Sequence, residues 1–343
     1  MSKTLFNRGN LIHDHNIEKD GFLIHYFLVQ LEDTFNKSAK KELEDFFKKY
    51  NDISKWMIFS DYVLYDKNKQ NDVMTFSIVP YVMEIEKYKQ ILNSLAPRDI
   101  KKMNSVNDEF INFLNNFPIL NLSFVLSKRR KFDYIDEKEY LIKKTTNALK
   151  MFRIWSISTP GAQEKYLNSV KSFEALLREL NKKSPNYKII RDIDILSSLI
   201  GFIGYQIAST SNIEVLSWLS DRDSMLTFGK NEKMKRKFIP YAFELATSLY
   251  HVLCDNNLKK FPDLICADAE TKEKNLWYDE FLRIPDLIAG TIADYNFDEN
   301  KHSHDKFVKV TERLLTNQEK VKTFHINLSI KNDVATSRLR LIK

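Results

Sequence analysis

Residues 56–82 decide the fold: they read WMIFSDYVLY (Trp56–Tyr65), DKNKQND (Asp66–Asp72) and VMTFSIVPYV (Val73–Val82). The first and third segments are aromatic and β-branched, and the segment between them is polar or charged. This pattern predicts two antiparallel strands joined by a short loop. Because strands and helices alternate further along the chain, the predicted class is α/β with a mixed sheet.

The rest of the chain is interpreted outward from this strand pair. Further strands are expected at Ile119–Leu126, Ile213–Leu219 and Asp263–Ala267, and a helix at Arg283–Tyr295. The chain is expected to divide into an N-terminal extension (1–50), the first part of an α/β core (51–136), a helical insertion (137–210), the second part of the core (211–300) and a C-terminal extension (301–343).

The composition excludes several classes of enzyme. The 343 residues include only 7 glycines, and none of them forms a G-x-G-x-x-G, G-x-x-x-x-G-K-[ST] or G-x-S-x-G motif. We therefore expect no dinucleotide-fingerprint enzyme, P-loop NTPase or nucleophile-elbow hydrolase. The balance of 53 Lys+Arg against 46 Asp+Glu gives a formal charge of +7, which is typical of a mixed globular surface.

The sequence predicts a cytoplasmic protein that does not bind a membrane. The two cysteines, Cys254 and Cys266, cannot form a disulfide framework or a Cys-rich zinc site. The longest uncharged apolar stretch, Ile195–Ala208, spans about 14 residues, and roughly 18 are needed to cross a bilayer. We therefore expect this stretch to form a buried helix.

Asp61 is the first candidate site residue. Strand alternation puts it on the same face as Met57, Phe59 and Val63, in the middle of an apolar row. Burial of an uncompensated carboxylate costs several kcal/mol, so a metal ion, an arginine or water should accompany it. The alternative is an edge strand on which Asp61 reaches solvent or pairs with a lysine.

Asp221 and Asp223 are the next candidates. They follow the strand that ends at Leu219, and ligands gather at the carboxyl ends of strands in open α/β sheets. The alternative is an Asx turn or helix cap in which Arg222 neutralises its neighbours.

A third acid lies in the segment LRIPDLIAG (Leu282–Gly290). As a helix, this segment would place Asp286 and Gly290 on a narrow face of small and acidic residues. Asp286 follows Pro285 and would lie in the first turn, so it could also be a partner of the helix dipole.

This last segment resembles the closing motif of a ribonuclease-H-like family of bacterial proteins of unassigned function. Members open with an acidic residue in the first strand, often as Asp-Glu-Ser-Gly, and close on a helix that reads roughly Leu-Gln-x-Ala-Asp-x-x-Ala-Gly. Here Asp61 lacks the Glu-Ser-Gly that would follow it, and Arg283 and Pro285 replace the Gln and the first Ala. The resemblance implies a ribonuclease-H-like core with a helical insertion.

The resemblance also implies a metal-dependent nuclease that hydrolyses phosphodiester bonds of DNA or RNA. Its catalytic acids would be Asp61, Asp221, Asp223 and Asp286, and Asp61, Asp221 and Asp286 would hold Mg²⁺ or Mn²⁺. The alternative function is a catalytically inactive module of the same fold that binds or assembles with a protein partner through its helical block.

Two basic runs could contact a nucleic-acid partner. One is Lys128, Arg129, Arg130 and Lys131, and the other includes Lys235 and Arg236. Such runs can neutralise phosphates, but they are also common in solvated loops and helix ends. The pairs His13/His15 and His302/His304 lack a third ligand at a diagnostic spacing, so we interpret them as parts of solvated loops.

Overall fold

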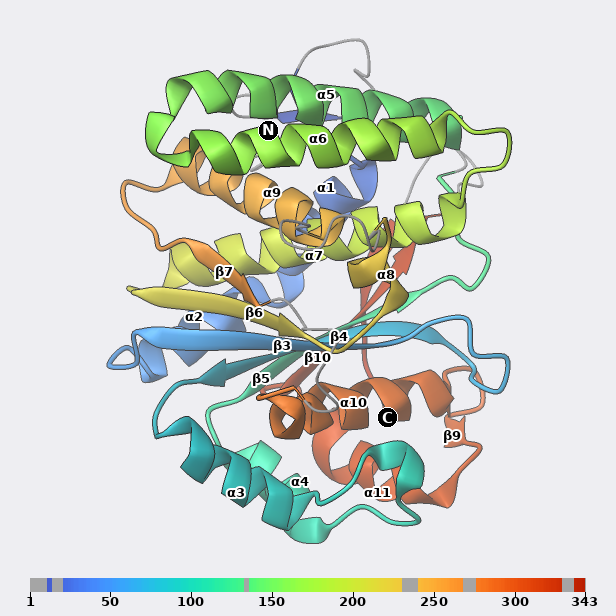
Figure 1. Ribbon diagram of the computed structural model, residues 1–343. Coiled ribbons are helices and arrows are strands. Elements are labelled where there is room, and N and C mark those ends of the chain that lie inside the picture. The colour runs from blue at the N-terminus through green and yellow to red at the C-terminus, as the bar shows by residue number, and fades with distance from the viewer. Residues whose placement is uncertain are drawn as a thin grey trace.

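The computed structural model describes residues 11–13, 21–132, 136–229, 240–267, 276–328 and 336–342. A central sheet separates two groups of helices, and one helical pair forms a further layer at the top (Figure 1). The chain is therefore α/β, as predicted.

The sheet has seven strands in the order β11-β10-β5-β4-β3-β6-β7. Its strands are β3 (Lys55–Val63), β4 (Asp72–Pro80), β5 (Leu120–Leu126), β6 (Val215–Ser220), β7 (Leu264–Ala267), β10 (Val321–Asn327) and β11 (Thr336–Arg340). Strands β3, β4 and β5 are antiparallel neighbours, while β6 is parallel to β3 and β7 is parallel to β6. The predicted strand pair around residues 56–82 is confirmed.

Both faces of the sheet are buried, which explains why its strands are so rich in apolar residues. On β3, Trp56 and Ile58 belong to the core on the upper face in Figure 1, and Met57 and Phe59 belong to the core on the lower face. The alternation of side chains along β3 thus supplies two separate hydrophobic cores.

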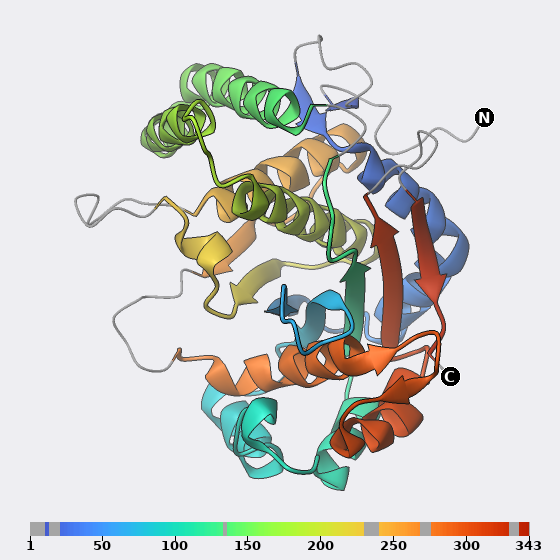
Figure 2. The same ribbon diagram turned by 90° about the vertical axis from the view of Figure 1, so that its right-hand side faces the viewer.

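Helix α10 covers the lower face of the sheet (Figure 2). The lower layer comprises α3 (Ile85–Leu95), η3 (Ile100–Lys102), α4 (Asp108–Asn116), α10 (Asp279–Asp294), β8 (Tyr295–Asn296), β9 (Lys301–His302), η6 (Asp305–Phe307), α11 (Val308–Val310) and η7 (Thr311–Leu315). Phe281 of α10 stacks on Phe59, with ring centroids 4.7 Å apart. The helix begins at Asp279, earlier than predicted, so Pro285 lies inside it and Asp286 is not in its first turn.

Helices α7 and α9 form the centre of the upper layer. The upper elements are β1 (Leu11–His13), β2 (Phe22–Ile24), α1 (Tyr26–Ser38), α2 (Lys40–Lys49), α5 (Glu137–Ser158), η4 (Pro160–Ala162), α6 (Gln163–Leu180), α7 (Tyr187–Thr210), α8 (Ser224–Thr227) and α9 (Tyr241–Asn257). Of the described helices, α7 is the one long and apolar enough to cross a membrane, but 83% of its apolar window is buried within the protein. It is a core helix, as expected from Ile195–Ala208.

The terminal segments share the cores of the rest of the chain. Strand β10 pairs with β5 and carries β11 on its other edge. Helix α1 lies beside β11, and the hydroxyl of Thr34 donates a 2.8 Å hydrogen bond to the backbone oxygen of Ser337 (Figure 2). These described parts of the predicted extensions therefore close the sheet edge and cover its upper face.

Candidate functional site

The predicted site lies where the parallel neighbours β3 and β6 end. Asp61 lies two residues before the end of β3, and Asp221 directly follows β6. The backbone N–H of Asp221 donates a 3.0 Å hydrogen bond to the oxygen of Ser60, which continues the pairing of the two strands. Asp61 and Asp221 therefore belong to adjacent chain segments, as the prediction required.

Asp61 occupies the interior of the sheet and is only 6% exposed. Strand β3 has β4 on one side and β6 on the other, so the edge-strand alternative is wrong. In register, Asp61 lies opposite Thr75, which in turn lies opposite Ser123, and the two hydroxyls are 2.9 Å apart. Asp61 therefore begins a buried polar row across the lower face of the sheet.

Asp221 and Asp223 have local roles in the turn after β6. A carboxylate oxygen of Asp221 accepts the N–H of Arg222 at 2.7 Å, and one of Asp223 accepts the N–H of Met225 at 2.7 Å. Asp223 is thus the N-cap of α8, which confirms the helix-cap alternative for Asp223. Burial raises the pKa of Asp223.

The upper face of the same strand ends carries a chain of hydroxyl groups that sequence analysis missed. The hydroxyl of Tyr62 lies 2.7 Å from that of Ser60 and 2.8 Å from that of Ser220, and the indole N–H of Trp218 donates to Ser60 at 2.8 Å. Burial raises the pKa of Tyr62 far above its usual range, so the phenol stays neutral. The sequence signal was the spacing of Ser60 and Tyr62 on one face of the strand.

Asp286 faces away from the sheet. It follows Phe281, which stacks on the sheet, by five positions, and this rotates its side chain about 140° around the helix axis. Its carboxylate accepts the backbone N–H of Ile100 at 3.1 Å, and a Cβ atom on Gly290, one turn further on, would also meet Ile100. Asp286 therefore anchors η3 on the outer face of α10.

The acids do not form the metal centre that the resemblance implies. In the described ranges, no group of three or more His, Cys, Asp or Glu side chains is arranged to hold a metal ion. On α10, the pKa of Asp279 is raised, mainly by burial and in smaller part by the negative charge of Asp221. The residues present thus do not fit Mg²⁺ or Mn²⁺ held by Asp61, Asp221 and Asp286 together.

Arg130 is buried, so its predicted contact with nucleic acid is wrong. Its guanidinium donates to Asp192 at 2.8 Å and to Asp72 at 2.5 Å, and its side chain has no exposed surface. In the same run, Lys128, Arg129 and Lys131 are exposed, and Lys128 donates to the backbone oxygen of Asp66 at 3.0 Å. Lys235 and Arg236 lie outside the described residues.

Tyr65 completes the surroundings of Arg130. The guanidinium carbon lies 4.3 Å from the centre of the Tyr65 ring, and the Tyr65 hydroxyl donates to Asp192 at 2.7 Å. Asp72 also accepts the backbone N–H of Tyr65 at 2.8 Å. This network joins the start of β4, the end of β5 and helix α7, so it ties the upper helices to the sheet.

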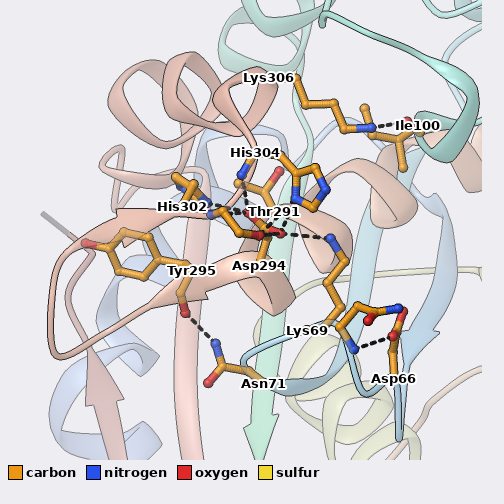
Figure 3. Close-up of polar contacts among 12 residues, drawn as sticks. Asp66, Lys69, Asn71, Ile100, Thr291, Asp294, Tyr295, His302, His304 and Lys306 are labelled. Atoms are coloured by element: carbon orange, nitrogen blue, oxygen red, sulfur yellow. Dashed lines mark hydrogen bonds and ion pairs between the residues drawn. The ribbon is translucent and has the colours of Figure 1, made fainter.

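A second buried acid, Asp294, organises the histidines that were interpreted as parts of a solvated loop (Figure 3). Its carboxylate accepts hydrogen bonds from Lys69 at 2.9 Å and from the hydroxyl of Ser303 at 2.5 Å, and lies 2.7 Å from Nδ1 of His304. His302 is 3% exposed and contacts the same carboxylate, so the solvated-loop interpretation is wrong for His302.

The Asp294 cluster lacks the geometry of a catalytic triad. In a triad the acid and the nucleophile bind opposite nitrogens of the imidazole. Here Asp294 and the hydroxyl of Ser303 both lie against Nδ1 of His304, at 2.7 and 2.9 Å. The cluster instead joins the β3–β4 loop, the end of α10 and the segment after β9.

A search of protein-family models, of curated proteins and of solved structures finds no match to this chain.

We predict that Arg130→Met lowers the free energy of unfolding by about 3–5 kcal/mol, because it leaves Asp72 and Asp192 buried without their cation. The matched control is Arg129→Met, on the exposed neighbour, which should change the free energy by less than about 0.5 kcal/mol. Urea denaturation measures both. Equal stability of the two variants would contradict a structural role for Arg130.

Asp294 should make stability depend on acid pH. Burial alone would raise its pKa, but hydrogen bonds from Ser303, Lys69 and His304 outweigh burial and hold the pKa well below its usual range. A lowered pKa in the folded state stabilises the protein above the unfolded pKa of about 4, and this stabilisation is lost as the pH falls through the folded-state value.

Asp294→Asn should therefore lower the free energy of unfolding by about 3 kcal/mol at neutral pH. It should also flatten the loss of stability seen between about pH 4 and pH 2. Urea denaturation across this pH range is the measurement, and the exposed Asp298→Asn serves as the control. A wild-type pH profile in Asp294→Asn would refute the assignment.

Proposed function

We propose that this chain is a catalytically inactive binding module built on a ribonuclease-H-like core. The strand order supports such a core, because β3, β4 and β5 form an antiparallel series and β6 and β7 then join the other side of β3 in parallel. Helix α10 follows these strands and packs on the sheet, at the point in the chain where the family's closing helix would lie.

The direction of Asp286 carries the proposal of inactivity. A two-metal nuclease needs its helix acid to face the strand acids. Asp286 binds the backbone N–H of Ile100 on the outer face of α10, while Asp61 lies on the sheet beneath the inner face. Asp223 is committed as a helix cap. Asp286 and Asp223, which the resemblance would assign to catalysis, thus each have a structural partner.

The outer helical hairpin, α5 with α6, is the proposed surface for a protein partner. It forms the layer furthest from the sheet (Figure 1). Near the turn of the hairpin it exposes Ile154, Ile157 and Leu167, at 56%, 80% and 44% of their surfaces. Exposed apolar side chains on neighbouring turns favour contact with another protein. The hairpin lies within the helical block through which the alternative function, an inactive module, would bind a protein partner.

The same proposal includes a nucleic-acid partner and a cytoplasmic location. Arg129 and Lys131 are exposed and able to meet phosphates, whereas Arg130 is not. Cys254 and Cys266 are both thiols without a disulfide, and burial raises the pKa of Cys254 to about 12. Thiols of this kind are compatible with a reducing compartment.

We expect the full chain to leave single- and double-stranded DNA and RNA intact in the presence of Mg²⁺ or Mn²⁺, because the described residues contain no group of three or more His, Cys, Asp or Glu side chains arranged to hold a metal ion. Gel analysis of a mixed substrate panel is the measurement. Metal-dependent cleavage that Asp61→Asn abolishes, and that the exposed Asp298→Asn leaves unchanged, would establish the nuclease instead.

Partner binding should depend on the hairpin. Chemical cross-linking in the native cell, followed by mass spectrometry, should yield a partner peptide linked to α5 or α6, and Ile157→Glu should reduce that product at least tenfold. Ile265→Glu is a matched control, because Ile265 is 54% exposed on β7. Equal loss in both variants, or no hairpin cross-link in the wild type, would refute this surface.

A further inference from the structure

A polar cavity lies between α9 and the hairpin of α5 and α6. Its volume is about 130 Å³, and helix α9 contributes Glu244, Ser248, His251 and Asp255 to its walls. The hairpin contributes aromatic and basic side chains on the opposite side. Since one water needs about 10–15 Å³ of such space, the cavity accommodates roughly ten non-hydrogen atoms.

The cavity follows from an unusual helix face. Glu244, Ser248, His251 and Asp255 recur every three or four residues, so they form one stripe along α9. A helix that lies between two layers is expected to be apolar on both sides. Helix α9 is apolar on one side, where Leu249 and Leu253 pack into the core. Where this polar stripe faces the hairpin, a cavity takes the place of close apolar packing.

Both signs of charge face this hollow. Lys165 of α6 brings an ammonium group, while Glu244 and Asp255 of α9 bring carboxylates. Among the described residues, neither Lys165 nor Asp255 takes part in an ion pair within 4.0 Å. The opposite charges are therefore available to a molecule that lies between them.

Glu244 is the buried, hydrogen-bonded acid of the cavity wall. It is 3% exposed, and one of its carboxylate oxygens accepts a 2.6 Å hydrogen bond from the hydroxyl of Ser169. Burial raises the pKa of Glu244, and the charge of Lys165 opposes that rise. Burial also lowers the pKa of His251, which favours a neutral ring that can donate one hydrogen bond and accept another. A second cation in the cavity would stabilise the carboxylate.

Two aromatic rings close the hairpin side of the cavity. The rings of Trp155 and Tyr166 lie with their centroids 5.6 Å apart, and both line the hollow. They give a ligand an apolar wall and a π-face that attracts a cation. The cavity thus combines a cationic end, an acidic wall and a small aromatic surface.

We propose that this cavity binds a zwitterion of the size of a free amino acid. Its carboxylate binds Lys165, its ammonium group binds Glu244 and Asp255, and its side chain lies against Trp155 and Tyr166. A ligand with one charge would pair with only one side of the cavity. The space for roughly ten non-hydrogen atoms matches a small or medium amino acid.

The test is a titration of the full chain with each free amino acid. Calorimetry measures the binding, and the thermal unfolding midpoint is measured with and without the amino acid. Ethylamine and inorganic phosphate serve as probes with a single charge. We expect at least one amino acid to bind with one-to-one stoichiometry and to raise the midpoint, because it binds only the folded state. The single-charge probes should bind at least tenfold more weakly.

Lys165→Gln and Asp255→Asn should each weaken this binding at least tenfold. Both side chains are exposed at the rim, and circular dichroism verifies that each variant is folded. Lys171→Gln is the matched control on the same helix, since Lys171 is exposed and does not line the cavity. Its affinity should equal that of the wild type.

Three results would overturn the proposal. One is the absence of binding by any amino acid at about 10 mM, which would mean that the cavity holds water alone. Another is phosphate or ethylamine binding as tightly as the best amino acid. The third is binding that Lys165→Gln and Asp255→Asn leave unchanged.

Discussion

The buried guanidinium of Arg130 is the interaction on which the arrangement of the upper helices depends. It lies between Asp72, at the start of β4, and Asp192, inside α7, and neither carboxylate has more than 3% of its surface exposed. Because a buried charge is costly without its partner, these three side chains require one another. They fix the position of α7 above the sheet, and α7 in turn carries α9 and the hairpin. Asp294 acts similarly below the sheet, where it joins the β3–β4 loop to the end of α10.

The cost of burying a charge without a partner also bears on the acids at the end of the sheet. Asp61 lies in a polar row on the sheet face that α10 covers, Asp223 caps α8, and Asp286 holds η3. A metal ion needs carboxylates whose oxygens converge on one point, and among the described residues no group of three or more His, Cys, Asp or Glu side chains does so. At the end of this mixed sheet, Asp223 and Asp286 therefore have structural roles.

The sequence was most informative where a pattern is local. Strand alternation around residues 56–82 predicted the central strand pair and the interior position of Asp61, and helical spacing predicted that Asp286 and Gly290 share a face. It could not predict which side of α10 faces the sheet, because that depends on the stacking of Phe281 on Phe59. Arg130 looked like one cation in a basic run, since its partners Asp72 and Asp192 are far away in the chain. His302 was misjudged although its partner Asp294 is near in sequence, because the turn that brings the two together lies between them and follows from the local fold.

Direct measurement of Mn²⁺ binding shows whether the acids at the end of the sheet form a metal centre. Electron paramagnetic resonance of the full chain titrated with Mn²⁺ counts bound ions without reference to a substrate. We expect no saturable site with a Kd below about 1 mM. Stoichiometric binding that Asp61→Asn removes, with the fold intact, would contradict this expectation and restore the nuclease interpretation.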